Sequence, residues 1–157
     1  ISSIKDRRVF GSKGLGEDNY RKMDKNSPMI THSRENKGLL YLLDVNLIKD
    51  IIANNMALKK GMDDSQPNGY MNFPQPAEGK YNLNNYFSHY EAEHRVPKIV
   101  NDVEVGYAWK KKRENNHFFD VAVYNYAARE IFIADLKLYD SRYKDITWQG
   151  YCDHINM

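Results

Sequence analysis

One acidic side chain stands out by its surroundings, because Asp120 lies in an apolar stretch directly after a run of positive charges. The stretch from Trp109 to Ala128 reads WKKKRENNHFFDVAVYNYAA. Its cations are Lys110, Lys111, Lys112 and Arg113. Such a run can contact DNA phosphates, and these contacts are independent of base sequence and sensitive to salt. An acid on an apolar helix beside clustered cations indicates chemistry rather than packing.

Each of these residues also has a purely structural interpretation. If Asn115 or Asn116 caps the helix, Asp120 lies in its first turn and gains about 0.3–1 kcal/mol from the helix dipole without any catalysis. The basic run, taken alone, is typical of a solvated strand end. The residues by themselves leave both alternatives open.

The first half of the chain predicts two short strands and two loops. Arg8 to Ser12 and Leu39 to Leu43 are short apolar segments typical of strands. The polar segment from Glu17 to Lys37 is predicted to be a long loop, and Met62 to Lys80 is a second loop because it contains three Pro and two Gly.

Between these loops, Asp44 is expected to cap a helix. Ile48 and Ile52 share one face of that helix, and Gly61 is its stop signal. We interpret Asp44 as an N-cap rather than as a catalytic acid. The helix therefore needs no functional explanation for its acidic start.

The second half predicts a helix, a hairpin and a closing helix. Asn84 to Arg95 has helical spacing, with Pro97 as its end. Lys98 to Val100 and Val103 to Lys110 form a predicted hairpin around Asn101-Asp102. The closing helix, Asn116 to Leu136, is apolar on most sides and should be deeply buried. The predicted buried face of the hairpin consists of Val103, Val105, Tyr107 and Trp109.

A zinc site is a weak alternative for the first of these helices. His89 and Glu93 are spaced i,i+4, but zinc needs three or four ligands, and no HExxH pattern occurs. We interpret Glu93 as the partner of a structural ion pair or hydrogen bond.

Composition limits the class of protein without choosing a function. The 157 residues make one ordinary domain, and the single cysteine, Cys152, excludes an internal disulfide. The net charge of +2 is too small for the whole surface to attract a polyanion, so any nucleic-acid contact must be local. No apolar run approaches the roughly 20 residues of a membrane span, so we expect no membrane contact.

Five short motifs occur in order along the chain. They are RVFGSKG (Arg7 to Gly14), LLDVNLIKDII (Leu42 to Ile52), YMNFP (Tyr70 to Pro74), YEAEHRV (Tyr90 to Val96) and the RENNHFFD segment that ends at Asp120. Together they resemble the C-terminal part of the nuclease domain of lambda-type, GpA-like terminase large subunits, the motors that package phage DNA. The resemblance covers roughly residues 7 to 135.

The resemblance implies an α/β fold of the RNase H-like nuclease type, in which helices flank a mixed sheet. That type of nuclease uses three catalytic acids, and Asp120 matches the third. The first two acids precede the Lys-Gly strand in the family and are absent from this chain, which begins at Ile1 rather than Met. We therefore expect a fragment or processed product without the N-terminal strands of the fold. Residues 1–135 would form the nuclease part, and 136–157 a tail of unknown role.

Two positions depart from the family pattern. Asn72 replaces the His before Phe-Pro, and His117 stands where the family has Glu, three residues before Asp120. The imidazole of His117 either approaches a metal ion or the scissile phosphate in place of that Glu, or is simply exposed at the helix start.

The chemistry implied is hydrolysis of a phosphodiester by two Mg²⁺ or Mn²⁺ ions. The paired ions activate water and stabilise the leaving 3′ oxygen, which requires several converging acids. Asp120 alone cannot hold both ions, so the other ligands are expected upstream of this chain. A carboxylate among apolar neighbours favours a compensating cation, which a bound metal would supply. Lys13 is a second cation expected beside the site, and the run from Lys110 to Arg113 is expected to bind DNA.

The implied function is endonucleolytic cutting of concatemeric viral DNA during packaging, in the host cytoplasm. The implied partners are double-stranded DNA and, in the same or a separate chain, the upstream half of the nuclease domain and an ATPase domain. The resemblance also suggests contacts with the small terminase subunit and the portal. The alternative is a DNA-binding or docking module of the packaging machinery without catalysis.

Overall fold

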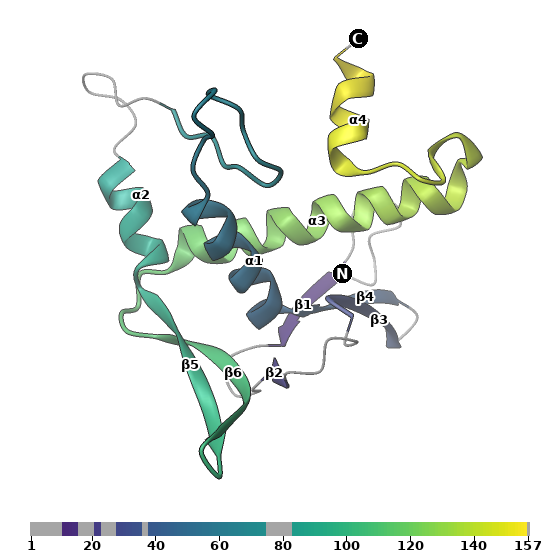
Figure 1. The fold of residues 1–157 in the computed structure, drawn as a ribbon. Helices are drawn as coiled ribbons and strands as arrows, with labels where there is room; N and C mark the ends of the chain where they lie inside the picture. Colours follow the sequence, from purple (N-terminus) through teal and green to yellow (C-terminus); the bar gives the residue numbers. More distant parts are fainter. Residues whose placement is uncertain (1–10, 16–20, 23–27, 36–37, 75–82, 157) are drawn as a thin grey trace.

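A computed structural model of the protein describes residues 11–15, 21–22, 28–35, 38–74 and 83–156. Its strands and helices come in groups along the chain, and the longest described element is a helix of 23 residues that crosses the molecule (Figure 1). In chain order they are β1 (Gly11–Leu15), β2 (Arg21–Lys22), β3 (Ile30–Glu35), β4 (Gly38–Asp44), α1 (Val45–Ala57), α2 (Leu83–Tyr90), β5 (Glu93–Val100), β6 (Val103–Lys111), α3 (His117–Tyr139), a 3₁₀ turn (Ser141–Tyr143) and α4 (Trp148–Ile155).

The described strands form two small sheets. In the first, β4 lies between β1, to which it is parallel, and β3, to which it is antiparallel. The second sheet is antiparallel and has the order β2-β6-β5. This arrangement confirms the α/β class and is compatible with an α/β nuclease domain. The RNase H-like topology stays a prediction.

Helix α1 begins where the sequence predicts. The Asp44 carboxylate accepts a hydrogen bond from the Leu47 backbone N–H at 3.0 Å, as an N-cap does. Asp44 also forms an ion pair with Arg21 of β2, so this one side chain joins the helix start to the second sheet. The N-cap interpretation of Asp44 is confirmed. The helix ends at Ala57, four residues before Gly61.

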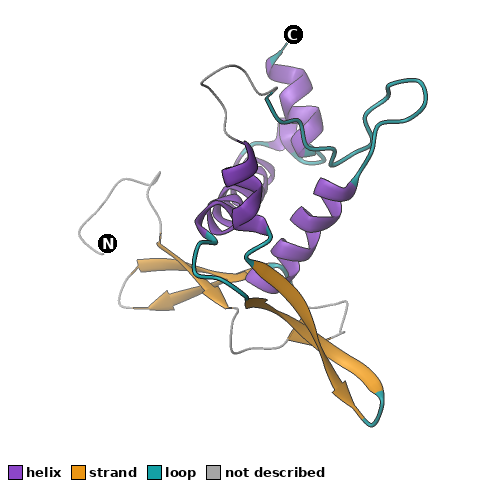
Figure 2. Cartoon of the chain, turned by 90° about the vertical axis from the view of Figure 1, so that its left-hand side faces the viewer, coloured by secondary structure: helices purple, strands orange, loops and turns teal. Residues whose placement is uncertain are grey.

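The hydrophobic core lies where α1 and α3 pack against each other beside β4. Leu43 and Ile48 are fully buried, and Phe119 and Val123 present one face of α3 to them. Both views place α3 between the first sheet and α4, with α1 beside it (Figures 1 and 2). Packing on this face fixes the start of α3, where Asp120 lies.

The prediction that the closing helix is deeply buried is wrong. Val121, Tyr124 and Phe132 on α3 are exposed, and only one stripe of the helix contacts the core. The helix runs unbroken through residue 135 to Tyr139, and α4 then returns to it through an edge-on contact between Phe132 and Tyr151 at 5.0 Å. The division of the chain at residue 135 stays a prediction.

The hairpin of β5 and β6 forms around the expected turn. Asn101 and Asp102 have positive φ angles of 49° and 62°, as tight two-residue hairpin turns require. The predicted buried face is wrong at its outer end, where Val103 is 60% and Val105 is 38% exposed. The reason is that this end of the hairpin projects away from the helices (Figures 1 and 2).

Other expected boundaries also differ from the structure. The predicted loop from Glu17 to Lys37 contains β2 and β3, so that prediction is wrong over its described part. The predicted helix from Asn84 to Arg95 ends at Tyr90, and Glu93 begins a strand instead. Pro97 therefore lies within β5 rather than ending a helix.

The remaining predictions fall partly on residues outside the described ranges. The strand expected over Arg8 to Ser12 is described from Gly11, and it continues to Leu15. Residues 62–74 of the second predicted loop contain no helix or strand, and 75–80 lie outside the described residues. The strand of residues 39–43 is confirmed as part of β4. No helix among the described residues is both long and apolar enough to span a bilayer.

Candidate functional site

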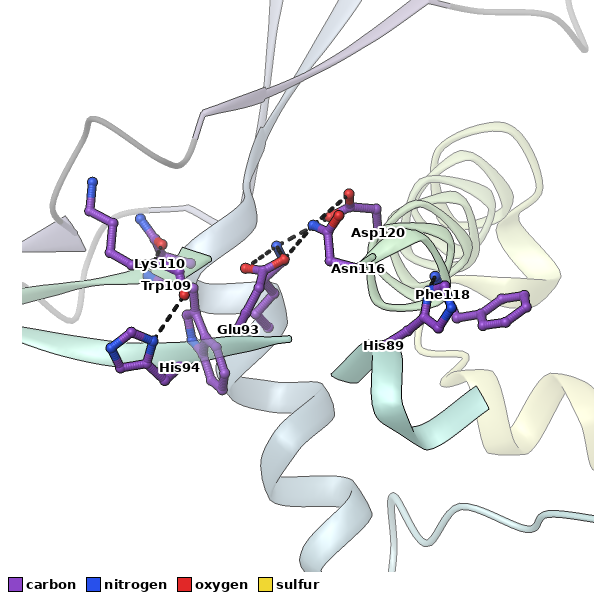
Figure 3. Close-up of polar contacts among 10 residues, drawn as sticks. His89, Glu93, His94, Trp109, Lys110, Asn116, Phe118 and Asp120 are labelled. Carbon is purple, nitrogen blue, oxygen red and sulfur yellow. Dashed lines mark hydrogen bonds and ion pairs between the residues drawn. The ribbon is translucent and has the colours of Figure 1, made fainter. Parts of the chain in front are cut away.

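Asp120 lies in a small polar cluster at the start of α3. Its Oδ2 accepts a hydrogen bond from Asn116 Nδ2 at 2.9 Å, and its Oδ1 lies 3.2 Å from Lys49 Nζ. The Asp120 side chain is 41% exposed, so it forms the solvent-facing edge of the cluster. Figure 3 shows Asn116 linking Asp120 to Glu93, between the start of β5 and the first turn of α3.

Glu93 is the centre of this cluster. Its two carboxylate oxygens accept from Lys49 Nζ at 2.6 and 2.7 Å, and Oε1 also accepts from Asn116 Nδ2 at 2.6 Å. The side chains of Glu93 and Lys49 are only 1% and 5% exposed. The interpretation of Glu93 as a structural ion-pair and hydrogen-bond partner is confirmed. Because Glu93 lies on a strand and His89 on a helix, the i,i+4 helical face proposed for them is wrong.

Helix α1 carries Lys49 into the cluster. The polar residues that precede and follow Lys49 on this helix, Asn46 and Asp50, bind β6. Asn46 Oδ1 accepts from the Trp109 backbone N–H at 2.8 Å, and Asp50 Oδ1 accepts from the Trp109 indole N–H at 2.7 Å. The Lys49 ammonium also lies 5.0 Å from the centre of the Phe119 ring. Asn46, Lys49 and Asp50 are spaced i, i+3, i+4, which places them on one face of α1.

The contact of Asp50 with β6 also involves Tyr107. Burial raises the pKa of Tyr107 well above its usual value, and its hydrogen bond to Asp50 raises that pKa further. Asp50 thus accepts from two rings of β6 while remaining on α1. These contacts hold α1 and β6 in one relative position, and they fix the path of the Lys49 side chain.

Asn116 is the N-cap residue of α3 by position, but its side chain makes no capping hydrogen bond. Its amide nitrogen donates instead to the carboxylates of Glu93 and Asp120. The backbone N–H of Phe118 donates to Nδ1 of His89 at 3.5 Å, so α2 supplies part of the cap that Asn116 does not. Figure 3 shows this second contact on the far side of α3 from Glu93.

The basic run follows β6 out of the sheet towards α3. Lys111 and Lys112 are exposed, whereas Lys110 is half-buried and its carbonyl accepts from His94 Nδ1 at 3.1 Å. The Arg113 guanidinium donates to the Ser88 carbonyl at 3.1 Å, which ties it to α2. The run therefore lies on the surface next to the Asp120 cluster, and its last cation is partly engaged in a structural contact.

The other two predicted residues are exposed. Lys13 lies on β1 opposite Leu42 of β4 and points to solvent. His117 is exposed in the first turn of α3, with its ring 5.9 Å from that of His89. The contacts of the described residues join neither side chain to Asp120. Their assignment to the site stays a prediction.

The donor set fits one metal contact rather than a complete metal centre. A carboxylate has about four acceptor positions, and Asp120 uses two of them for Asn116 and Lys49. An exposed carboxylate oxygen is also a ligand that Mg²⁺ prefers. Within the described ranges, however, no three His, Cys, Asp or Glu side chains converge to hold a metal ion. The described part of the chain thus offers Asp120 as a single ligand.

A separate pocket of about 780 Å³ lies between α2, α3 and α4. Tyr70, Phe118 and Trp148 are among its aromatic lining residues, but no residue of the predicted site lines it. Asp120 lies outside this pocket, and 41% of its side chain is exposed.

A comparison with family models gives the family of the chain. The model of the terminase large subunit gpA endonuclease domain matches residues 2–141. The match covers most of the 157 residues, and the chain belongs to this family of packaging nucleases. A search of curated proteins and a search of solved structures gave no significant match. The resemblance based on the five motifs is confirmed.

Sequence reasoning did not find Lys49 or the role of Asn116. One signal was present, since a lysine at position 49 interrupts the apolar run Leu47 to Ile52 of a helix that buries that face. A buried lysine needs a carboxylate partner. The sequence could have raised that question, but it could not identify Glu93, 44 positions away, as the partner.

Proposed function

We propose that this chain contributes to a Mg²⁺- or Mn²⁺-dependent endonuclease that cuts concatemeric viral DNA during genome packaging. The observation that carries the proposal is Asp120, a partly exposed carboxylate fixed at the edge of a buried polar cluster in a chain of the terminase endonuclease family. The proposal adds the metal, the DNA and the concatemeric substrate to what family membership supports.

In this proposal Asp120 is the metal-facing acid of the described residues, and further acids come from outside them. Bound Mg²⁺ or Mn²⁺ would lower the pKa of the attacking water and stabilise the leaving oxygen. The role of the chain itself is to hold the Asp120 carboxylate in place through Asn116 and Lys49. His117, one turn before Asp120, would lie close enough to the scissile phosphate to contact it when DNA is bound.

The basic run supports the DNA part of the proposal. Lys111 and Lys112 are exposed on the chain segment that leads directly to α3, so a duplex that reaches Asp120 passes beside them. Their contacts with phosphate would position DNA without reading its sequence. Lys13 would add a further phosphate contact. Other partners in the packaging machinery, including the small subunit and portal, belong to the same proposal.

The test uses the full-length protein and DNA that carries the viral packaging sequence, with Mg²⁺ or Mn²⁺ present. Asp120→Asn keeps the side-chain volume and removes the negative charge, so cleavage should fall by orders of magnitude while the circular dichroism spectrum is unchanged. Asp135→Asn is the matched control, because Asp135 is an exposed aspartate on the same helix, and it should cleave at the wild-type rate. Wild-type cleavage by Asp120→Asn would show that Asp120 is not catalytic and only interacts with the helix dipole.

The second candidate function is a DNA-binding or docking module without catalysis. It is favoured by one observation, that the described residues bring no three metal-binding side chains together. Under this alternative, neither aspartate substitution would change cleavage, because the protein would not cleave DNA.

A further inference from the structure

We propose that Lys49 and Asn116, both held by Glu93, are positioning residues that fix the Asp120 carboxylate for phosphodiester cleavage. This inference rests on the proposed function and extends it to three residues outside the predicted catalytic set. The three come from α1, β5 and the start of α3, so the fold itself sets their relative positions.

The first argument is that each oxygen of Asp120 has its own donor. Asn116 Nδ2 donates to Oδ2 at 2.9 Å, and Lys49 Nζ lies 3.2 Å from Oδ1. A partly exposed aspartate would otherwise rotate about its side-chain bonds. Two donors from different parts of the fold hold the plane of the carboxylate, and 41% of the Asp120 side chain stays exposed.

The second argument concerns Glu93, which holds both donors in turn. Oε1 accepts from Lys49 and Asn116, both at 2.6 Å, and Oε2 accepts from Lys49 at 2.7 Å. Lys49 and Asn116 therefore cannot turn away from Asp120 without breaking bonds to a carboxylate that is almost fully buried. Hydrogen-bonded partners of this kind commonly orient the carboxylates that bind metal ions.

The third argument is that the cluster is poorly explained as a stabilising device. A buried ion pair often contributes less to stability than apolar residues of the same volume. Asn116 also gives up the helix cap that its position offers, because its side chain bonds to the carboxylates instead. Counting formal charges, one lysine faces two acids, so the cluster has one negative charge in excess, and its exposed edge is Asp120.

The test compares a double variant with a matched control in the full-length protein. Lys49→Met with Glu93→Gln removes the buried charges together, keeps both side-chain lengths and retains an amide oxygen that can accept from Asn116. Lys60→Met with Asp64→Asn makes the same chemical changes in the exposed ion pair of Lys60 and Asp64. Neither variant leaves an unpaired buried charge.

Two readouts separate positioning from simple structural support. We expect the double variant to lose about 10- to 100-fold in kcat, and to bind Mn²⁺ more weakly by a similar factor, measured from the electron paramagnetic resonance signal of free Mn²⁺. Its affinity for duplex DNA should stay at the wild-type value, as should all three quantities in the control. Wild-type kcat and Mn²⁺ binding in a folded double variant would overturn the proposal.

Asn116→Ala provides the test if the double variant does not fold. It leaves the ion pair of Lys49 and Glu93 intact and removes no capping bond, so the protein should fold while Asp120 loses the donor to Oδ2. The same loss of kcat and Mn²⁺ affinity is expected, and wild-type values would overturn the proposal.

The failure of this proposal differs from failure of the proposed function. If Asp120→Asn is inactive but the double variant and Asn116→Ala both retain wild-type values, only the positioning role is wrong. If the wild-type protein neither binds Mn²⁺ nor cleaves DNA, or if Asp120→Asn is fully active, the proposed function is wrong and the positioning role is wrong with it.

Discussion

The amide of Asn116 donates a hydrogen bond of 2.6 Å to Glu93, although the two residues are 23 positions apart and lie on different elements. This bond joins the first residue of β5 to the start of α3. Because Asn116 also donates to Asp120, the position of that carboxylate depends on the strand as well as on its own helix. If α3 alone positioned the Asp120 carboxylate, only backbone N–H groups of the first helical turn would do so.

Asp44→Ala should weaken folding, because the structure gives Asp44 both a cap and an ion pair. Loss of the cap lowers the free energy of unfolding by about 0.5–2 kcal/mol, and loss of the partner of Arg21, a half-buried residue of β2, adds to this. Urea unfolding measures the change. Asp44→Asn retains an acceptor for the cap and should lose less, and the exposed Asp63→Ala should change stability by less than about 0.5 kcal/mol. Equal stability of Asp44→Ala and wild type would contradict the cap.

Features that depend on neighbours in the chain could be predicted from the sequence. Asp44 begins α1 because an acid followed by helical spacing is a local pattern, and the Asn101-Asp102 turn is equally local. Glu93 is different, because its segment has helical spacing but pairs along β6 as a strand. That pairing is a tertiary contact, and it overrides the local preference.

The missed strands have a similar explanation. Pro97 indicates a helix end when it is considered alone, yet β5 is an edge strand of its sheet, where a missing N–H is tolerated. β3 is also an edge strand, and Thr31 and His32 on it are exposed, so it lacks the apolar alternation that would predict a strand.

The candidate site could be predicted only in part. Asp120 is a candidate because of its motif and its neighbouring cations, which are adjacent in sequence. Lys49 and Glu93 reach it from 71 and 27 positions earlier, through the packing of α1 and β5 around the start of α3. The α/β class followed from the motifs, whereas the convergence of these side chains required the structure.

The basic run should change the salt dependence of DNA binding. If Lys111 and Lys112 neutralise phosphates, changing both to Gln means that fewer counterions are released when the protein binds. The slope of log affinity against log salt should then shrink by about 0.9 for each phosphate that is no longer neutralised, equally for unrelated duplex sequences. Binding measured by fluorescence anisotropy over a salt series gives the slope.

Lys59→Gln with Lys60→Gln is the control for this charge change. These two lysines are also adjacent and exposed. They come just after α1, and about 50 residues separate them from the basic run. The control should leave the slope unchanged. An unchanged slope in a folded variant of Lys111 and Lys112 would show that the basic run does not contact DNA phosphates. The tail after Asp135 would then be the alternative DNA contact.

The 157-residue chain alone should cleave plasmid DNA poorly in Mg²⁺ or Mn²⁺. Two-metal hydrolysis needs several converging acids, and the described residues present only Asp120 for this purpose. Conversion of supercoiled to nicked plasmid measures the activity. Strong nicking that EDTA abolishes and Asp120→Asn removes would show that the chain contains a complete site.

The central claim, that Asp120 is a metal-binding acid of a nuclease, is tested most directly by Mn²⁺ in crystals of the full nuclease region. Diffraction data collected at the manganese absorption edge locate the ion by its anomalous signal. The account predicts a peak within roughly 2.0–2.2 Å of an Asp120 carboxylate oxygen, with Asn116 and Lys49 still bound to that carboxylate. A cleavage-competent crystal whose manganese peaks lie elsewhere, with Asp120 contacting only Asn116 and Lys49, would contradict it.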